Sequence, residues 1–358
     1  MESKIKILNT IFLTIFVFAC AFLLSACEHK HEPRNEYLFN ATHHWHSCSD
    51  NECNEKLNFE EHDFSNGVCS LCHYGATACI TTNNGITYFK TLASAVSSVL
   101  DETQTTIKLL NTSTTGNVIS GCGIIIPENK NIILDLNSCT YLIDAPAVGS
   151  SGTTTNGMQL LKNSAVTIKN GTISHKTTLT ENSDNQDVQI LIQNYANLNL
   201  ENVVLDGRSK AVNAQGTCLY VLSNNFGNIT FKGSTRIICD EERQAGVGGC
   251  AFDLWYGMSS VYDDGIFVTF DSTFNGTIDG KIEYGSHSAL AGNFEDKTKL
   301  TINGGTFTTL DFYFTRTNST FANIEIKGGS FRFDVSNYVD LDNYTCTQNG
   351  TWWIVSEK

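Results

Sequence analysis

Two close pairs of cysteines near the N-terminus could bind a metal ion. They form the motifs Cys48-x4-Cys53 and Cys69-x2-Cys72, and residues 54–68 lie between them. Two short loops of this kind direct four thiolates at one tetrahedral zinc ion, and four protein ligands leave no open position for catalysis. We therefore predict a structural zinc site made of Cys48, Cys53, Cys69 and Cys72.

Two histidines in the same stretch offer alternative ligands. His46 or His62 could replace one thiolate, because imidazole is also a zinc ligand. Two disulfides are the competing interpretation, since an exported protein can oxidise its cysteines. Either arrangement would act as a structural clip, because so short a stretch cannot hold a stable core unaided.

Acidic and aromatic side chains gather in a second stretch, between residues 239 and 264. Aromatic ring faces can stack on the C–H faces of sugars while carboxylates accept hydrogen bonds from sugar hydroxyl groups. The candidate ligand-binding residues are Asp253, Trp255, Tyr256 and Tyr262. The candidates for the acid/base pair of a sugar-cleaving enzyme are Asp240, Glu241, Glu242, Asp263 and Asp264. The competing interpretation is a solvated surface loop with Trp255 packed on the fold, and His175 and His287 are expected to be isolated and exposed.

The first residues have the three-part form of a signal peptide. Lys4 and Lys6 precede the apolar run 7–24, which ends in Leu-Ser-Ala-Cys at 24–27. This ending resembles a bacterial lipobox, which implies that Cys27 is lipidated and becomes the new N-terminus. The alternatives are a plain secretory signal or an N-terminal membrane anchor. A lipid on Cys27 would hold the rest of the chain at the membrane, outside the cytoplasm.

A repeat that runs from about residue 80 to the C-terminus predicts the elements that must position these residues. Each copy alternates apolar and polar residues and turns at Asn or Gly; the copies are 132–137, 166–173, 198–205, 229–233, 268–271, 300–307 and 324–331. Alternation predicts strands with one buried face. A unit of about 20–50 residues that recurs predicts a solenoid, because one unit cannot bury its apolar face alone. Strands without much helix favour a parallel β-helix, whose corners Asn and Gly tolerate.

Both ends of such a solenoid need covering. An amphipathic helix is expected at the first end, with Thr91 as its N-cap. Its apolar face is expected to contain Leu92, Ala95, Val96, Val99 and Leu100. Bulky aromatic residues within 352–355 are expected to close the other end.

Two resemblances support this division of the chain. Residues 77–358 resemble right-handed parallel β-helix proteins of the pectin-lyase-like type, and bacterial surface proteins of that fold in particular. The shared motifs lie at 89–96, 166–172, 300–307 and 328–355. Residues 43–75 resemble a short module of bacterial surface proteins, with a His-x-Trp-x-x-Cys start, a central His and a Gly-Val-Cys-x-x-Cys ending. The fold hosts lyases, hydrolases, adhesins and inert stalks, so the resemblance implies fold more than function.

The composition agrees with stacked strands. Charged residues make up 17% of the chain, against about 25% in ordinary domains. Asn and Thr ladders satisfy turns without placing like charges in register. A net charge of −14 argues against nucleic-acid binding. The other cysteines are expected to be mainly buried thiols, with one or two disulfides as an alternative: Cys79, Cys122, Cys139, Cys218, Cys239, Cys250 and Cys346.

We therefore predict an all-β chain: signal peptide 1–26, polar tether 27–42, zinc-ribbon-like module 43–76 and right-handed parallel β-helix 77–358 with an N-terminal capping helix. A β-sandwich or antiparallel barrel is the rival architecture. We expect a cell-envelope lipoprotein that binds a glycan or a surface protein without catalysis. The alternatives are a polysaccharide lyase or glycoside hydrolase, in which calcium could take part, and a structural stalk.

Overall fold

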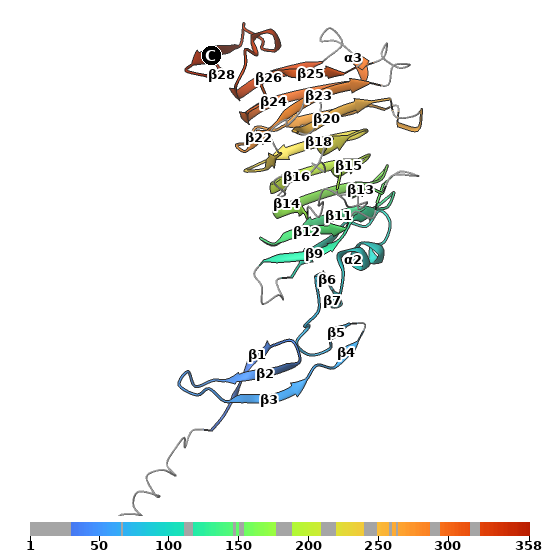
Figure 1. Cartoon of the computed structure of the whole chain (residues 1–358), viewed down its shortest axis with the longest axis vertical. Helices are drawn as coiled ribbons and strands as arrows, with labels where there is room; N and C mark the ends of the chain where they lie inside the picture. Colours follow the sequence, from blue (N-terminus) through green and yellow to red (C-terminus); the bar gives the residue numbers. More distant parts are fainter. Residues whose placement is uncertain are drawn as a thin grey trace, which may run out of the picture. The chain divides into compact units, whose positions relative to one another are not determined.

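The structure is a computed structural model, and it contains two compact units. It describes residues 30–65, 67–110, 117–145, 148–149, 154–176, 188–208, 220–239, 249–257, 260–262, 264–286, 294–315 and 323–358. The smaller unit takes in Met1–Ser65 and Cys69–Tyr74, and the larger unit takes in Asn66–Val68 and Gly75–Lys358. Figure 1 shows the strands of each.

The larger unit is a β-solenoid built from strands that stack in parallel (Figure 1). One seven-stranded sheet contains, in spatial order, β10 (Ile124–Ile126), β13 (Asn156–Leu160), β15 (Ile190–Asn194), β17 (Tyr220–Asn224), β20 (Cys250–Tyr256), β23 (Lys281–Ser286) and β25 (Phe312–Thr315). Each of these strands comes from a different coil of the solenoid and pairs with the strands of the coils before and after it. The predicted parallel β-helix is confirmed.

A second sheet of 16 strands carries the sequence repeat. Its parallel part runs through β8 (Thr105–Leu109), β11 (Asn131–Asp135), β14 (Ala165–His175), β16 (Asn197–Asp206), β18 (Gly227–Lys232), β21 (Ile266–Phe270), β24 (Thr298–Phe307) and β26 (Ile324–Phe331). Strands β9 (Val118–Cys122), β12 (Thr140–Ala145), β19 (Arg236–Ile238) and β22 (Thr277–Asp279) join beside this path. Successive repeat copies from β11 to β26 are therefore hydrogen-bonded neighbours.

The corners of successive coils use left-handed Asn and Gly residues. Asn170, Asn202 and Gly233 have φ of 60°, 51° and 57°. The Asn202 side-chain oxygen accepts a hydrogen bond from the Ser234 backbone N–H at 3.0 Å. A Cβ at Gly233 would lie 2.2 Å from that same oxygen. The predicted role of Asn and Gly at the corners is thus observed at successive levels of the stack.

Like side chains stack on each other inside the solenoid. The rings of Phe231 and Phe270 are stacked with centroids 4.3 Å apart, and those of Phe307 and Phe331 are stacked at 4.9 Å. Asn194 donates from its side-chain nitrogen to the side-chain oxygen of Asn224 on the next coil, at 3.3 Å. Such ladders satisfy buried polar groups without charge.

A short helix covers the first coils, as predicted. Helix α2 (Leu92–Ser98) starts with a capping box between Thr91 and Ser94, and Leu92 is buried against the solenoid core. Leu100 is 72% exposed, so its assignment to the apolar face was wrong. The reason is that the helix ends at Ser98, and Val99 has extended backbone geometry that turns the chain away.

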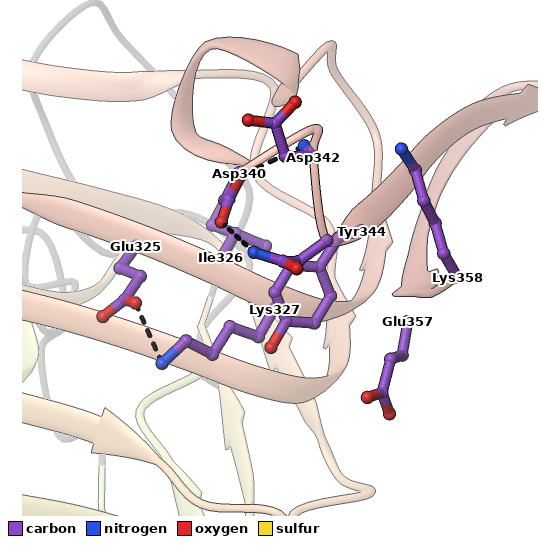
Figure 2. Close-up of a pocket in the computed structure, with 9 residues that line it drawn as sticks. Glu325, Ile326, Lys327, Asp340, Asp342, Tyr344, Glu357 and Lys358 are labelled. Atoms are coloured by element: carbon purple, nitrogen blue, oxygen red, sulfur yellow. Dashed lines mark hydrogen bonds and ion pairs between the residues drawn. The ribbon is translucent and has the colours of Figure 1, made fainter.

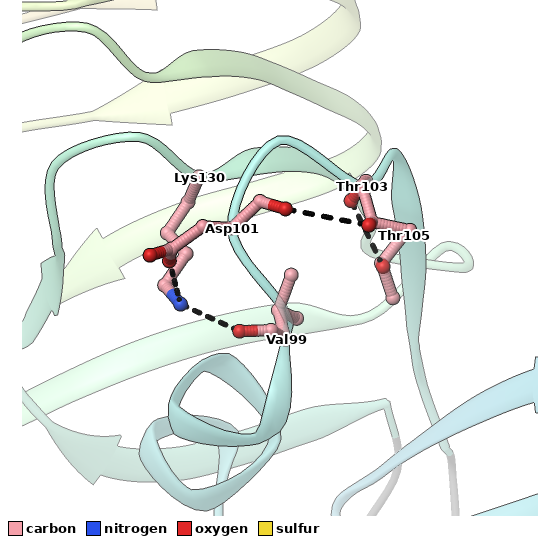
Figure 3. Close-up of polar contacts among 5 residues, drawn as sticks. All are labelled: Val99, Asp101, Thr103, Thr105 and Lys130. Carbon is pink, nitrogen blue, oxygen red and sulfur yellow. Dashed lines mark hydrogen bonds and ion pairs between the residues drawn. The ribbon is translucent and has the colours of Figure 1, made fainter.

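A polar clamp holds this turn after α2 (Figure 3). The Lys130 ammonium group donates to the Val99 carbonyl at 2.6 Å and to the Asp101 carboxylate at 2.6 Å. Thr105 donates from its hydroxyl group to the Thr103 carbonyl at 3.1 Å. The bond to the Val99 carbonyl satisfies a backbone group at the helix end that has no partner within the helix.

Antiparallel strands flank the parallel stack at each end of the 16-stranded sheet. Strands β6 (Ala78–Thr82) and β7 (Gly85–Phe89) lie at the first end, and β27 (Tyr344–Asn349) and β28 (Trp352–Glu357) lie at the last. β28 pairs antiparallel with β26, and Trp353 packs against the core. Short helical turns occur at η1 (Ser260–Tyr262), α3 (Phe294–Lys297) and η4 (Ser336–Tyr338).

The smaller unit is a three-stranded antiparallel sheet in the order β1 (Pro33–Phe39), β2 (His43–Cys48) and β3 (Lys56–Glu61). Residues 33–39, which we expected in the tether, form β1, because their backbone pairs with β2. The short strands β4 (Phe64–Ser65) and β5 (Val68–Cys69) follow. The predicted signal peptide and Cys27 lie outside the described residues. In the described part of the chain, no helix has the length and apolar character needed to cross a membrane.

Candidate metal centre

The smaller unit is organised around cysteine and histidine rather than around apolar side chains. Among its described residues, those that are buried are His44, Cys48, Cys69 and Cys72. Large apolar side chains such as Leu38, Phe59 and Phe64 are exposed. This unit therefore lacks the apolar core that normally stabilises a domain, and its interior consists of potential metal ligands.

Four donors converge on one point in this unit. His44, His62, Cys69 and Cys72 each offer one ligand atom, and these atoms all lie within 4.8 Å of one another. The Cys69 sulfur lies 3.7 Å from His44 Nδ1, and the Cys72 sulfur lies 3.4 Å from His62 Nδ1. We call these residues the four-donor cluster.

Local structure explains why these side chains meet. His44 projects from strand β2, and the Cys69-x2-Cys72 turn closes with a bond from the His73 N–H to the Cys69 carbonyl at 3.0 Å. His62 Nε2 lies 2.9 Å from the Asn40 carbonyl, and the His62 ring stacks on Tyr74 with centroids 4.6 Å apart. A donor bond from Nε2 to a carbonyl leaves the Nδ1 lone pair directed at the cluster, which is how metal-binding histidines are commonly oriented.

The two thiols of the cluster differ in acidity. Burial acts to raise the pKa of Cys69, but hydrogen bonds from the backbone N–H groups of Cys72 and Leu71 lower this pKa to about 7. Burial raises the pKa of Cys72 to about 11, and the neighbouring Cys69 adds to the rise. Backbone N–H groups aimed at a sulfur stabilise the thiolate, which is the form that binds metals.

The structure divides the four predicted cysteine ligands between two places. Cys69 and Cys72 are in the four-donor cluster, whereas Cys48 and Cys53 lie with His31 in a separate group of three donors. Strand β2 keeps the two groups apart. His44, of the four-donor cluster, is near the start of β2 and Cys48 is at its end, so the rise of a β-strand places them about 13 Å apart. One ion cannot bridge that distance.

The predicted alternative ligands also separate. His62 belongs to the four-donor cluster, whereas the Nδ1 atom of His46 lies 3.2 Å from the Glu36 carbonyl, outside both groups. Our sequence reasoning missed His31 and His44. The run His43-His44-Trp45-His46 signals several candidate ligands, but only the register of β2 selects His44.

The predicted glycan-binding residues do not form an exposed ledge in the described structure. Asp253 is 3% exposed and accepts hydrogen bonds from the Asn224 N–H at 2.7 Å and the Ser223 hydroxyl at 3.1 Å. Burial raises the pKa of Asp253 well above its usual value. Tyr256 is buried in the core, and Trp255 is half-buried. Strand β20 extends through 250–256, and this places these side chains in the sheet rather than in a loop.

The remaining residues of that stretch have different positions. Tyr262 is half-buried and packs on Tyr195 with ring centroids 4.6 Å apart. Asp264 is exposed. The candidate carboxylates Asp240, Glu241, Glu242 and Asp263 lie outside the described residues, as does His287. His175 is fully buried, so the expectation that it is exposed was wrong; its Nε2 atom lies 3.1 Å from the Gly207 carbonyl.

A groove on the larger unit contains aromatic and cationic side chains; of these our sequence reasoning noted only Trp352, as part of the expected end cover and not as part of a groove. Its volume is about 410 Å³, and its lining includes Asp279, Lys281, Tyr313, Arg332 and Trp352. The Arg332 guanidinium lies over the Trp352 ring at 5.0 Å, and the Lys281 ammonium lies over the Tyr313 ring at 5.5 Å. We call it the Trp352 groove. Its residues come from separate coils, so no local motif reveals it.

A second groove, of about 530 Å³, lies near the C-terminus (Figure 2). Lys327 pairs with Glu325 at 2.9 Å, and Asn343 donates to the Asp340 carboxylate at 2.7 Å. Hydrogen bonds from Lys299 and Lys327 lower the pKa of Glu325. These acids are engaged by neighbouring groups of the protein, which is the arrangement of a solvated surface rather than of a ligand site.

The other described cysteines are thiols. Cys79, Cys139, Cys239 and Cys250 are buried, Cys346 is half-buried and Cys122 is exposed; Cys218 lies outside the described residues. Burial raises the pKa of Cys79, Cys139 and Cys346. This agrees with the prediction of mainly buried thiols, which behave as small apolar side chains.

Comparisons with family models, with curated proteins and with solved structures find no match to this chain. The resemblance to pectin-lyase-like proteins and the lipobox therefore stay predictions. What the structure itself establishes is a β-solenoid and Cys/His groups at metal-binding distances.

Proposed function

We propose that the four-donor cluster binds one structural zinc ion, which stabilises the smaller unit. The observation that carries this proposal is that the buried residues described in that unit are all cysteine or histidine. A structural zinc ion contributes about 10–16 kcal/mol of apparent folding free energy in small domains. A contribution of that size replaces the apolar core that the unit lacks.

The donor distances support zinc in particular. Zn–S bonds of about 2.3 Å and Zn–N bonds of about 2.0 Å at a tetrahedral angle place sulfur and nitrogen about 3.5 Å apart. The S–N distances from Cys69 to His44 and from Cys72 to His62 are 3.7 Å and 3.4 Å. Two thiolates and two imidazoles form a closed Cys2His2 set, and four protein ligands hold zinc without an open position.

Metal analysis of paired variants tests this zinc site. The exported chain, residues 27–358 with Cys27→Ser, is compared with the same chain carrying Cys69→Ser and Cys72→Ser. We expect the double variant to lose one equivalent of zinc and to become sensitive to protease within 30–74, while the far-UV signal of the solenoid persists. The control is His46→Ala, because His46 lies outside both donor groups. Equal metal content in the double variant and its parent would overturn the proposal.

We further propose that the chain is exported and anchored to the membrane by a lipid on Cys27. The support is the apolar run 7–24 followed by Leu-Ser-Ala-Cys at 24–27. Mass spectrometry of the protein from its own membrane fraction tests this, with Cys27→Ser as the comparison. A diacylated N-terminal peptide is expected only from the unsubstituted chain, and an unmodified Cys27 would contradict the proposal.

For the solenoid we propose non-catalytic glycan binding at the Trp352 groove. The groove combines the ring faces of Tyr313 and Trp352 with the charges of Lys281 and Arg332. Ring faces can stack on sugars, and a guanidinium group can bind a carboxylate or sulfate through two parallel hydrogen bonds. Such a cationic groove on a chain of net charge −14 favours an anionic glycan.

A glycan array that also records absorbance of unsaturated products tests this binding. We expect retention of anionic glycans, with Trp352→Ala weakening binding about 2–10-fold, the size of one aromatic contact. Tyr262→Ala is the matched control, because Tyr262 belongs to the predicted ledge and not to the groove. Release of an unsaturated product would favour the lyase alternative. Absence of binding to every glycan would favour a structural stalk.

A further inference from the structure

A second group of metal-ligand side chains lies apart from the four-donor cluster. We infer that His31, Cys48 and Cys53 form a second metal centre, which binds one divalent cation of the zinc class and faces solvent on one side. This inference goes beyond the proposed structural zinc, and it does not need that site to be occupied.

The donor atoms of His31, Cys48 and Cys53 have the spacing of one coordination sphere. All three lie within 4.8 Å of one another, and the Cys53 sulfur lies 3.3 Å from His31 Nδ1. This S–N distance is close to the edge of about 3.5 Å expected for tetrahedral zinc. Two thiolates and one imidazole favour zinc-class cations over magnesium or calcium, which prefer oxygen.

Backbone contacts hold these three residues together without help from a metal. The Ser49 N–H donates to the Glu32 carbonyl at 2.7 Å, and Arg34 Nε donates to the Cys48 carbonyl at 3.1 Å. The Cys53 N–H donates to the Asp50 carbonyl at 3.2 Å, which closes the loop between the two cysteines. The segment before β1 and the loop after β2 are therefore tied to each other, so the donors approach as part of the fold.

Exposure separates this group from the four-donor cluster. Cys48 is buried, Cys53 is half-buried and His31 is exposed, so one side of the group faces solvent. Within the described residues, no fourth Cys, His, Asp or Glu belongs to it. The two centres therefore differ in accessibility as well as in position.

Metal stoichiometry distinguishes the two centres. Cobalt and zinc are titrated into the reduced exported chain (27–358, Cys27→Ser) after removal of bound metal. We expect two equivalents in this parent chain and one equivalent after Cys48→Ser with Cys53→Ser. The same number of bound equivalents in that variant and in its parent would overturn the second centre. A Cys48–Cys53 disulfide in chain isolated without reductant would also overturn it.

A milder variant guards against loss of folding. His31→Ala removes an exposed donor and should weaken cobalt binding at one of the two sites. The loss should exceed about 10–100-fold, which is the cost of removing a residue that only hydrogen-bonds to a metal ligand. His46→Ala, which removes a histidine outside both groups, should bind two equivalents with parental affinity. An unchanged second cobalt affinity in His31→Ala would contradict the proposed ligand set.

Solvent access to the second centre can be measured separately. In the Cys69→Ser, Cys72→Ser chain only the second centre remains, and we expect a chelator to remove its cobalt faster than it removes cobalt from the Cys48→Ser, Cys53→Ser chain, where only the four-donor cluster remains. If the first chain binds cobalt and the second does not, the proposed structural zinc fails while the second centre stands. Equal rates of cobalt loss from the two chains would refute the solvent-facing position of the second centre.

Discussion

Phe270 is the residue whose removal should cost the solenoid most. Its side chain is fully buried, and its ring lies 4.3 Å from that of Phe231, 4.9 Å from Phe274 and 5.0 Å from Phe307. Truncation of a buried Phe to Ala costs about 3–5 kcal/mol, and each aromatic pair adds about 0.5–1.5 kcal/mol beyond burial. The truncation range already includes ordinary ring contacts, so with three of them we expect Phe270→Ala to lie at its upper end, at about 4–5 kcal/mol.

Urea denaturation followed by far-UV circular dichroism measures this loss. The matched control is Leu100→Ala, because Leu100 is 72% exposed and should change stability by less than about 0.5 kcal/mol. We expect a lower midpoint for Phe270→Ala with an unchanged slope. If Phe270→Ala destabilises the chain no more than Leu100→Ala does, the interior stack does not hold the coils together and the reasoning is refuted.

Three further single variants and one double variant test other features. Asp253→Asn should flatten the pH profile of stability. The raised pKa of Asp253 makes the native state bind more protons than the unfolded state, so the stability of the parent chain should fall as pH rises above the unfolded pKa of about 3.9. A parental profile in the variant would contradict this. Thr91→Ala should cost about 1 kcal/mol through loss of the cap bond to Ser94, measured by denaturation. Gly233→Ala should cost at least about 1–2 kcal/mol for its left-handed backbone. Adding Asn202→Gly should recover part of the Gly233→Ala loss by removing the clash, and no recovery would show that the contact is unimportant.

The solenoid was predictable because its physical causes are local and repeated. Alternating apolar residues specify strands, and Asn or Gly at a constant place specifies the corner, as Asn170 and Asn202 show. The capping helix was predictable for the same reason, since Thr91 and the apolar spacing lie within one short segment. Its end was predicted less well, because an apolar pattern does not report that Val99 leaves the helix.

The metal ligands were only partly predictable. The spacing of the cysteines predicts that Cys69 and Cys72 are neighbours, but it does not show whether the Cys48–Cys53 and Cys69–Cys72 loops approach each other. The loops do not meet, because His44 and Cys48 lie near opposite ends of β2 and belong to different donor groups. The prediction of an exposed glycan-binding ledge did not match the structure for a related reason. Asp253 and Tyr256 belong to strand β20, so their neighbours are residues one coil away, such as Ser223, rather than residues nearby in sequence.

The antiparallel strands at the two ends of the 16-stranded sheet have a consequence for assembly. A parallel stack can in principle grow without limit, since a second copy could add its first coil to the last coil of the first. β28 runs opposite to β26 and β6 runs opposite to β8, but the outermost strands β27 and β7 reverse direction once more. These antiparallel pairs extend the 16-stranded sheet alone, since the seven-stranded sheet ends at β10 and β25. An added coil would need an edge of both sheets at the same level, so a pair of strands that extends one sheet alone favours a solenoid of defined length over an end-to-end fibre.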